Sequence, residues 1–248
     1  MKPALKYGLI ALVVVVIAGG AGAYFLFFAD DSPAKVSLDA AVDQVSTTTT
    51  AGGDAGTDTT AADGIAGTWT VDDASGEFDF ESATGTFAGF RIQENLASIA
   101  ATEAVGRTGD VTGTMTIDGT TLTEASIEVD LTTITSNESR REDKIQSALE
   151  TGEFPTATFE LTEPVDLGAD AANGDAVDVE AVGDLTIHGV TKQVTFPLQA
   201  KLVDGTVVVV GSLDITFADY GVEVPTAPVV VSVEDHGPIE LQLLFTRS

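Results

Sequence analysis

Apolar and polar residues alternate along most of the chain from about residue 67 to the C-terminus. The clearest case is the stretch 177–202, in which two alternating runs flank the dipeptide His188-Gly189. Side chains of a strand point to opposite faces with period two, so each run predicts a strand with one dry and one wet face. The apolar positions of the two runs are Val177, Val179, Ala181, Leu185, Ile187, Val194, Phe196, Leu198, Ala200 and Leu202.

The same alternation predicts further strands. The segment 93–104 is ambiguous and fits either a short helix or an extended crossing. Asp118-Gly119 is a strong hairpin signal between two of the strands. About eight or more strands joined by short turns favour a closed up-and-down barrel or a sandwich, with an all-β fold. The additional runs cover residues 69–71, 78–80, 85–92, 111–117, 125–131, 157–161, 207–217 and 239–245.

One soluble helix is expected between these strands. Ser139 stands three residues before Glu142, which is the spacing of a capping box, and Ile145, Ala148 and Leu149 line one side. Gly152 is placed to end the helix.

The N-terminus has a different pattern. After a short segment 1–6 that carries two lysines, residues 7–28 are apolar throughout. At 1.5 Å per residue this run spans about 33 Å, which matches the hydrocarbon core of a bilayer. The flanking charges place the N-terminus in the cytoplasm. We therefore expect a single-pass signal anchor in the cell membrane, with the rest of the chain on the extracytoplasmic side; cleavage near Ala23 and secretion is the alternative.

Residues 29–64 are small and polar, rich in Thr, Ala, Gly and Asp. Such a segment buries too little apolar surface to offset its ordering entropy, so it predicts a disordered linker. An O-glycosylated stalk fits the same composition. The folded domain is then expected to cover residues 65–248.

Composition excludes several classes of function. The formal net charge is −28, from 39 acidic and 11 basic residues, which argues against a nucleic-acid partner. The chain has no cysteine, and its two histidines are too few for a multi-histidine metal site. No Ser-His-Asp, metal or phosphate-loop constellation is present, so we expect no enzymatic activity and no metal.

Three blocks of sequence resemble the YceI-like lipid/polyisoprenoid-binding domain family. They are Gly67 to Asp72, Phe154 to Phe159 and, most specifically, Gly183 to Lys192, which reads GDLTIHGVTK. The resemblance runs from about Gly67 to the C-terminus. It implies an extended lipocalin-like antiparallel β-barrel with one short α-helix, whose interior tunnel holds a long isoprenoid or fatty chain.

This resemblance makes the aromatic and aliphatic side chains the candidate binding residues. His188 and Gly189 are interpreted as turn-forming residues, because no nucleophile or second histidine lies near them. The only bound molecule expected is an isoprenoid lipid or a prenyl quinone, and a homodimer stays open. The candidate tunnel-lining residues are Trp69, Phe78, Phe80, Phe87, Phe90, Ile127, Val129, Phe154, Phe159, Leu185, Ile187, Val194, Phe196, Phe217 and Tyr220.

Two functions therefore compete. In the first, a membrane-tethered barrel binds, stores or transports a polyisoprenoid or other long-chain lipid without bond making. In the second, side chains fill the barrel, and the domain is a structural or adaptor module of the cell envelope with a protein partner.

Overall fold

The computed structural model describes residues 32–51, 64–72, 77–96, 102–223 and 230–248. The predicted spanning helix 7–28 lies outside these ranges, as do residues 29–31 and 52–63 of the predicted linker. Within the described ranges, no helix combines the length and the apolar character that crossing a bilayer requires.

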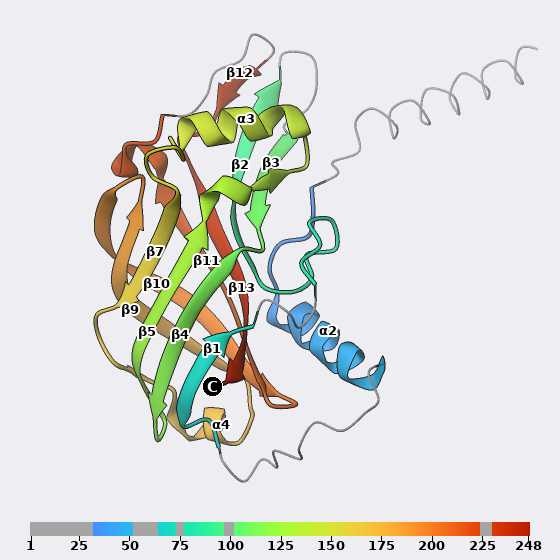
Figure 1. The fold of residues 1–248 in the computed structure, drawn as a ribbon, viewed down its shortest axis with the longest axis vertical. Coiled ribbons are helices and arrows are strands. Elements are labelled where there is room, and N and C mark those ends of the chain that lie inside the picture. The colour runs from blue at the N-terminus through green and yellow to red at the C-terminus, as the bar shows by residue number, and fades with distance from the viewer. Residues whose placement is uncertain (1–31, 52–63, 73–76, 97–101, 224–229) are drawn as a thin grey trace, which may run out of the picture.

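Eight antiparallel strands form a closed ring (Figure 1). Closure comes from β1, which pairs with β4 on one side and with the C-terminal half of β13 on the other. The fold is thus the all-β barrel that the alternation and the turn signals predict, and the sandwich alternative is not what forms. In ring order the strands are β1 (Gly67–Val71), β4 (Val111–Asp118), β5 (Thr121–Asp130), β7 (Thr156–Leu161), β9 (Val177–Ile187), β10 (Val190–Val203), β11 (Thr206–Thr216) and β13 (His236–Arg247).

The sheet also extends beyond the ring, because β13 is long enough to pair with a further strand through its N-terminal half. β2 (Phe87–Leu96) pairs there, and β3 (Thr102–Thr108), β6 (Thr135–Ser136) and β12 (Val230–Val233) continue from it. Of the two interpretations of residues 93–104, the extended one is correct for the described residues.

Short helices lie at both ends of the barrel, and the prediction of one helix is therefore too low. α3 (Ser139–Ala148) and the 3-10 helices η2 (Leu131–Thr133) and η3 (Phe217–Tyr220) lie at one end, which we call the α3 end. α4 (Gly168–Ala172) lies at the opposite end, which we call the α4 end, and β8 (Val165–Asp166) precedes it. Ser139 does not cap α3, because it is already the first helical residue and the N-cap is Glu138.

The prediction of a disordered linker is wrong for residues 32–51. Residues 32–37 run extended along the outside of the barrel and lead into α2 (Leu38–Ala51) (Figure 1). We call residues 32–46 the strap. Leu38 and Ala41 pack on Val208, Val210 and Leu244, which are buried on the outer face of β11 and β13. Composition misled the prediction, because a few apolar residues at helical spacing suffice when a partner surface is available.

A buried network of charges lies beneath the strap. The Glu240 carboxylate accepts from Arg91 Nε at 2.9 Å and from Arg107 Nε and Nη2 at 2.9 and 2.6 Å. Arg91 also donates to Glu103 at 2.6 Å. Both guanidinium groups donate to backbone carbonyls of the strap, so the strap closes the network from outside.

Burial acts to lower the pKa of both guanidinium groups in this network, but the net shifts have opposite signs. Burial lowers the pKa of Arg107, and the nearby Glu240 only partly opposes it. Burial also acts to lower the pKa of Arg91, but hydrogen bonds and charges from Glu240 and Glu103 outweigh it, so the net shift is upward. Both groups stay charged, and the carboxylates are what make their burial tolerable.

Candidate functional site

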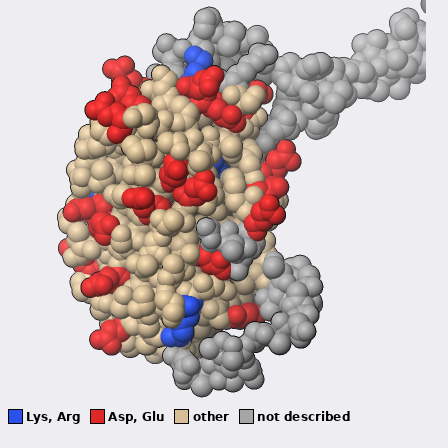
Figure 2. Space-filling model, in the orientation of Figure 1, with Lys and Arg blue, Asp and Glu red and all other residues tan. Residues whose placement is uncertain are grey.

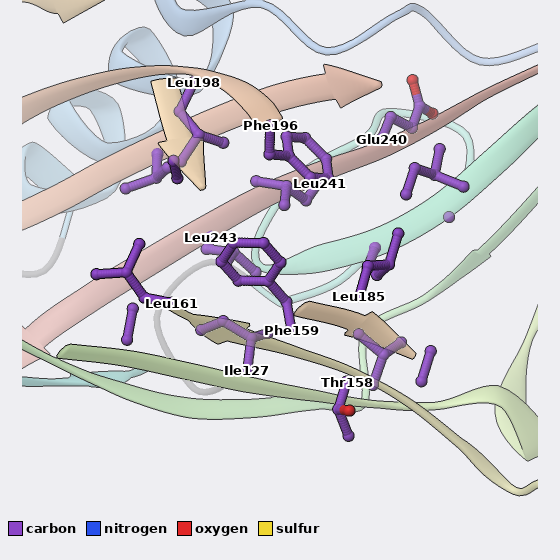
Figure 3. A pocket seen from close by; sticks show the side chains of 18 of the residues that line it. Ile127, Thr158, Phe159, Leu161, Leu185, Phe196, Leu198, Glu240, Leu241 and Leu243 are labelled. Carbon is purple, nitrogen blue, oxygen red and sulfur yellow. The ribbon is translucent and has the colours of Figure 1, made fainter. Parts of the chain in front are cut away.

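The barrel interior contains a cavity of about 230 Å³. It is lined almost entirely by carbon, because the inner faces of the strands carry aliphatic and aromatic side chains (Figure 3). The polar residues on its wall are Thr158, Tyr220 and Glu240. The Glu240 carboxylate is directed away from the cavity, toward the arginines of the outer network (Figure 3).

Small residues on the wall explain why this interior is hollow. Ala88, Ala125, Ala157, Ala181 and Ala200 stand at lining positions where larger side chains would fill the space. Other lining side chains keep some exposed surface although they point inward, as Leu198, Leu241 and Phe159 do. In a close-packed core such residues would be fully buried. A dry apolar cavity of about 150 Å³ in another protein binds benzene, so this one has room for a larger apolar ligand.

Two phenylalanines cross the middle of the cavity. The rings of Phe159 and Phe196 meet edge to face, with their centroids 6.3 Å apart (Figure 3). The ring of Phe159 lies across β9 at Gly183, where an added Cβ would be 2.4 Å from its Cζ atom. Glycine at this position is therefore what allows the ring its place against the strand.

Different elements line the two ends of the cavity. At the α4 end the wall merges into a tightly buried cluster that includes Ile65, Trp69, Val165 and Ala171. The Trp69 Nε1 donates to the Ile65 carbonyl at 2.9 Å, and the Arg247 guanidinium lies 4.7 Å from the ring centroid. At the α3 end the lining residues Leu149 and Val222 are only half-buried. Leu131, Phe217 and Tyr220 at the same end are buried, and Leu167 next to α4 is half-buried, so both ends of the wall combine buried and half-buried lining residues.

Nine of the fifteen candidate lining residues lie on the cavity wall. They come from six elements of the barrel and its extension, and Figure 3 shows Ile127, Phe159, Leu185 and Phe196 grouped around the same space. The nine are Phe90, Ile127, Val129, Phe159, Leu185, Ile187, Phe196, Phe217 and Tyr220.

The other six candidates do not line the cavity. Phe87 lies on the outer face of β2, fully buried 4.4 Å beneath the Arg107 guanidinium and against the Phe78 ring. Phe80 belongs to the turn between Asp79 and Thr84, where a strand was expected. Alternation identifies residues that share a face, but it does not tell whether that face is the barrel interior or a second buried layer.

The remaining three of the six pack close to the cavity without lining it. Trp69 belongs to the buried cluster at the α4 end. Val194 packs against the cluster of Leu185, Ile187 and Tyr220. Phe154 packs edge-on against the His188 imidazole, with centroids 4.6 Å apart.

His188 and Gly189 form the two-residue turn between β9 and β10. Their φ angles are 52° and 71°, the left-handed values that a tight hairpin turn of this type requires. The His188 ring lies 3.3 Å (Nδ1) from the Tyr220 carbonyl and 3.1 Å (Nε2) from the Glu150 carboxylate. It therefore joins the turn to η3 and to the residues that follow α3, all at the α3 end.

Sequence reasoning missed several aliphatic residues of the wall and the whole charge network. Ile215, Leu241 and Leu243 line the cavity and were already on predicted alternating faces, so the signal was present. Arg91, Arg107 and Glu240 gave no local signal, because each sits in a strand like any exposed charge. Among the described residues, no group of His, Cys, Asp and Glu side chains is arranged to hold a metal.

The outer surface is acidic where it is exposed. Figure 2 shows carboxylates spread over the visible face, with few basic side chains between them. An apolar interior inside an acidic shell is suited to an uncharged, water-insoluble ligand and not to a polyanion.

The sequence is similar to a known protein family and to several of its members. A family model described as a YceI-like domain matches residues 69–245. A UPF0312 protein of Shewanella denitrificans is 30% identical over 155 residues, which cover 58% of this chain and 76% of that protein. A UPF0312 protein of Pseudomonas paraeruginosa is 32% identical over 141 residues, covering 52% and 69% of the two chains.

Solved structures share the fold. A polyisoprenoid binding domain from Saccharophagus degradans, implicated in plant cell wall breakdown, superposes with a TM-score of 0.53 at 17% identity, covering 73% of this chain and 98% of that one. BcnA of Burkholderia cenocepacia gives a TM-score of 0.52 at 17% identity, covering 70% and 98%. At this identity the likeness concerns the fold alone.

Proposed function

The chain belongs to the YceI-like domain family, and we propose that it is a non-enzymatic binding protein for a polyisoprenoid or other long-chain lipid held inside the barrel. The observation that carries the proposal is the hollow interior, whose wall offers carbon almost throughout. The Saccharophagus degradans structure of the same fold is a polyisoprenoid binding domain, which supports the same ligand class.

The wall explains why a long apolar chain would be preferred. Each buried methylene contributes about 0.8 kcal/mol, so about ten carbons would gain about 8 kcal/mol before the entropy of association is subtracted. The polar groups on the wall are too few to orient a polar ligand by several hydrogen bonds. Selectivity would therefore come from the length and shape of the chain, and a prenyl quinone or an isoprenoid lipid would suit it.

The adaptor alternative fits the interior less well. It requires a barrel filled by its own side chains, whereas Leu198 and Leu241 point inward and keep exposed surface. A protein partner bound to the outer surface would also leave the cavity unexplained.

The proposal includes the membrane anchor at residues 7–28, with the barrel on the extracytoplasmic side. The support is the sequence alone: an uninterrupted apolar run of bilayer length that follows two lysines. A carrier of water-insoluble lipid functions most simply beside the bilayer that supplies or receives its ligand.

The test is the lipid content of the full chain, purified in mild detergent, washed free of loosely bound lipid and extracted with organic solvent for mass spectrometry. The Ala125→Phe/Ala200→Phe double variant places two rings in the cavity. The matched control is Thr195→Phe, which adds a ring at an exposed position of β10 between two inward-facing residues.

We expect one class of long-chain lipid to copurify with the wild type and with Thr195→Phe. The double variant is expected to lose most of this lipid, provided that circular dichroism shows it folded. Lipid-free wild-type protein that also takes up no added prenyl quinone would exclude the proposed function, as would equal lipid in all three proteins.

A further inference from the structure

The strap is fixed to the barrel from its first described residue. The Ser32 hydroxyl donates to the Glu103 carbonyl at 2.9 Å. Arg91 Nη2 donates to the Pro33 and Ala34 carbonyls, each at 2.7 Å, and Arg107 Nη2 donates to the Ala34 carbonyl at 2.7 Å. Three consecutive residues are thus held, two of them by guanidinium groups that are almost completely buried.

This attachment lies at the α3 end of the barrel. The Glu103 carbonyl that receives the Ser32 hydroxyl also accepts from the Asn137 side chain at 3.2 Å, and Asn137 leads directly into α3. From there residues 32–37 of the strap run along the outside of the barrel and lead into α2 (Figure 1). The chain therefore reaches the barrel at its α3 end.

The distance from the predicted bilayer exit to this attachment is short. Three residues separate Phe28, the last of the apolar run, from Ser32. Even fully extended, this connection spans at most about 14 Å. A flexible coil through residue 64 would instead let the barrel move roughly 30–35 Å from the bilayer.

We propose that the strap is a rigid bracket that holds the α3 end of the barrel against the membrane surface, so that lipid passes between the bilayer and the cavity at that end. The inference rests on the anchor of the proposed function and adds the orientation of the barrel. The partner is the lipid bilayer itself, identified by the short connection and by the fixed point at which it ends. The α4 end, with Trp69 buried in its cluster, then faces away from the membrane.

The orientation can be measured because the full chain has no cysteine. Lys144→Cys places a single thiol on exposed α3, and Asp170→Cys places one on exposed α4. Each full-length variant is labelled with a fluorophore and reconstituted into phosphatidylcholine vesicles that contain a nitroxide-headgroup lipid. Quenching by the nitroxide then reports proximity to the membrane surface.

Two insertions separate a bracket from a flexible tether. About twenty Gly and Ser residues, which reach roughly 25 Å as a coil, are inserted either between Asp31 and Ser32 or between Asp58 and Thr59. The first insertion lengthens the connection before the strap, and the second lengthens the chain only after it. A tether that ran freely to residue 64 would respond to both insertions alike.

We expect strong quenching at the Lys144→Cys label and little at the Asp170→Cys label. The insertion before Ser32 should remove most of the quenching, and the insertion after Asp58 should leave it unchanged. Equal quenching at both labels, equal effects of the two insertions, or failure of the full chain to float with vesicles would each overturn the proposal. Lipid extraction from the same samples tests the binding function separately, since unequal quenching with an empty cavity would leave the orientation standing.

Discussion

Replacing Glu240 by Gln removes the central charge of the buried network while keeping the size of the side chain. The carboxylate accepts three hydrogen bonds, one from Arg91 and two from Arg107. The exposed fractions are 2% for Arg91 and 0% for Arg107, so water cannot take over its role. Arg107 Nη1 already has no partner, which makes this guanidinium the more vulnerable of the two.

The magnitude follows from the partners that remain. Removing one member of a buried ion pair typically costs about 3–5 kcal/mol, because it leaves the other charge uncompensated. Arg91 keeps Glu103, and both guanidinium groups keep the strap carbonyls, so the lower end of that range applies. A loss of about 3 kcal/mol lowers the melting temperature of a domain of this size by roughly 6–12 °C.

The assay is thermal unfolding of the full chain followed by circular dichroism. Glu128→Gln is the matched control, since it removes the same charge from an exposed position on β5 and should change the free energy of unfolding by less than about 0.5 kcal/mol. The Arg107→Gln/Glu240→Gln double variant should be more stable than the sum of its single variants predicts, because the two residues interact directly. A Glu240→Gln variant that melts with the Glu128→Gln control would refute the buried network and the docking of the strap above it.

Two further predictions concern the α3 end. Gly189→Ala should destabilise the protein by more than Gly119→Ala. Both substitutions force alanine into a left-handed conformation, which costs about 1–2 kcal/mol. Only at Gly189 would the new Cβ also lie 2.6 Å from the Phe154 ring. Equal losses in chemical denaturation would show that Phe154 yields freely. Burial, aided by the charge of Asp219, raises the pKa of Tyr220 above its ordinary value of 10.0. The neutral phenol therefore stabilises the fold below pH 10.0, and this contribution is lost as the pH rises through the higher pKa of the folded state. The ultraviolet tyrosinate titration of wild type minus Tyr220→Phe should therefore have its midpoint above pH 10.0, and a midpoint at or below it would contradict the burial.

The sequence predicted the strands of the ring and two of their hairpins, because the causes of these elements are local. Alternation identified the strands of the ring, and the glycine-containing dipeptides at Asp118-Gly119 and His188-Gly189 located two of its hairpins. Both turns use left-handed glycines, a requirement that can be read from two residues.

Some signals were present but needed a second element to interpret them. The continuous run Val207–Val210 is buried on both faces, toward the cavity and toward α2. Leu38, Ala41 and Val45 have helical spacing inside a segment whose overall composition is that of a linker. Phe87 and Phe90 are an odd number of positions apart on one strand, so they point to opposite faces and cannot both line the cavity.

The sequence alone specified the eight strands of the ring and two of its hairpins. The three-dimensional arrangement was needed to show that β1 pairs with β13 and closes the ring, that the interior is hollow, and that Arg91, Arg107 and Glu240 are buried beneath the strap. The difference lies in how far apart in the sequence the interacting residues are. A turn or an alternating strand depends on neighbours along the chain, whereas closure, cavity volume and burial of a charge depend on side chains that are brought together from distant parts of it.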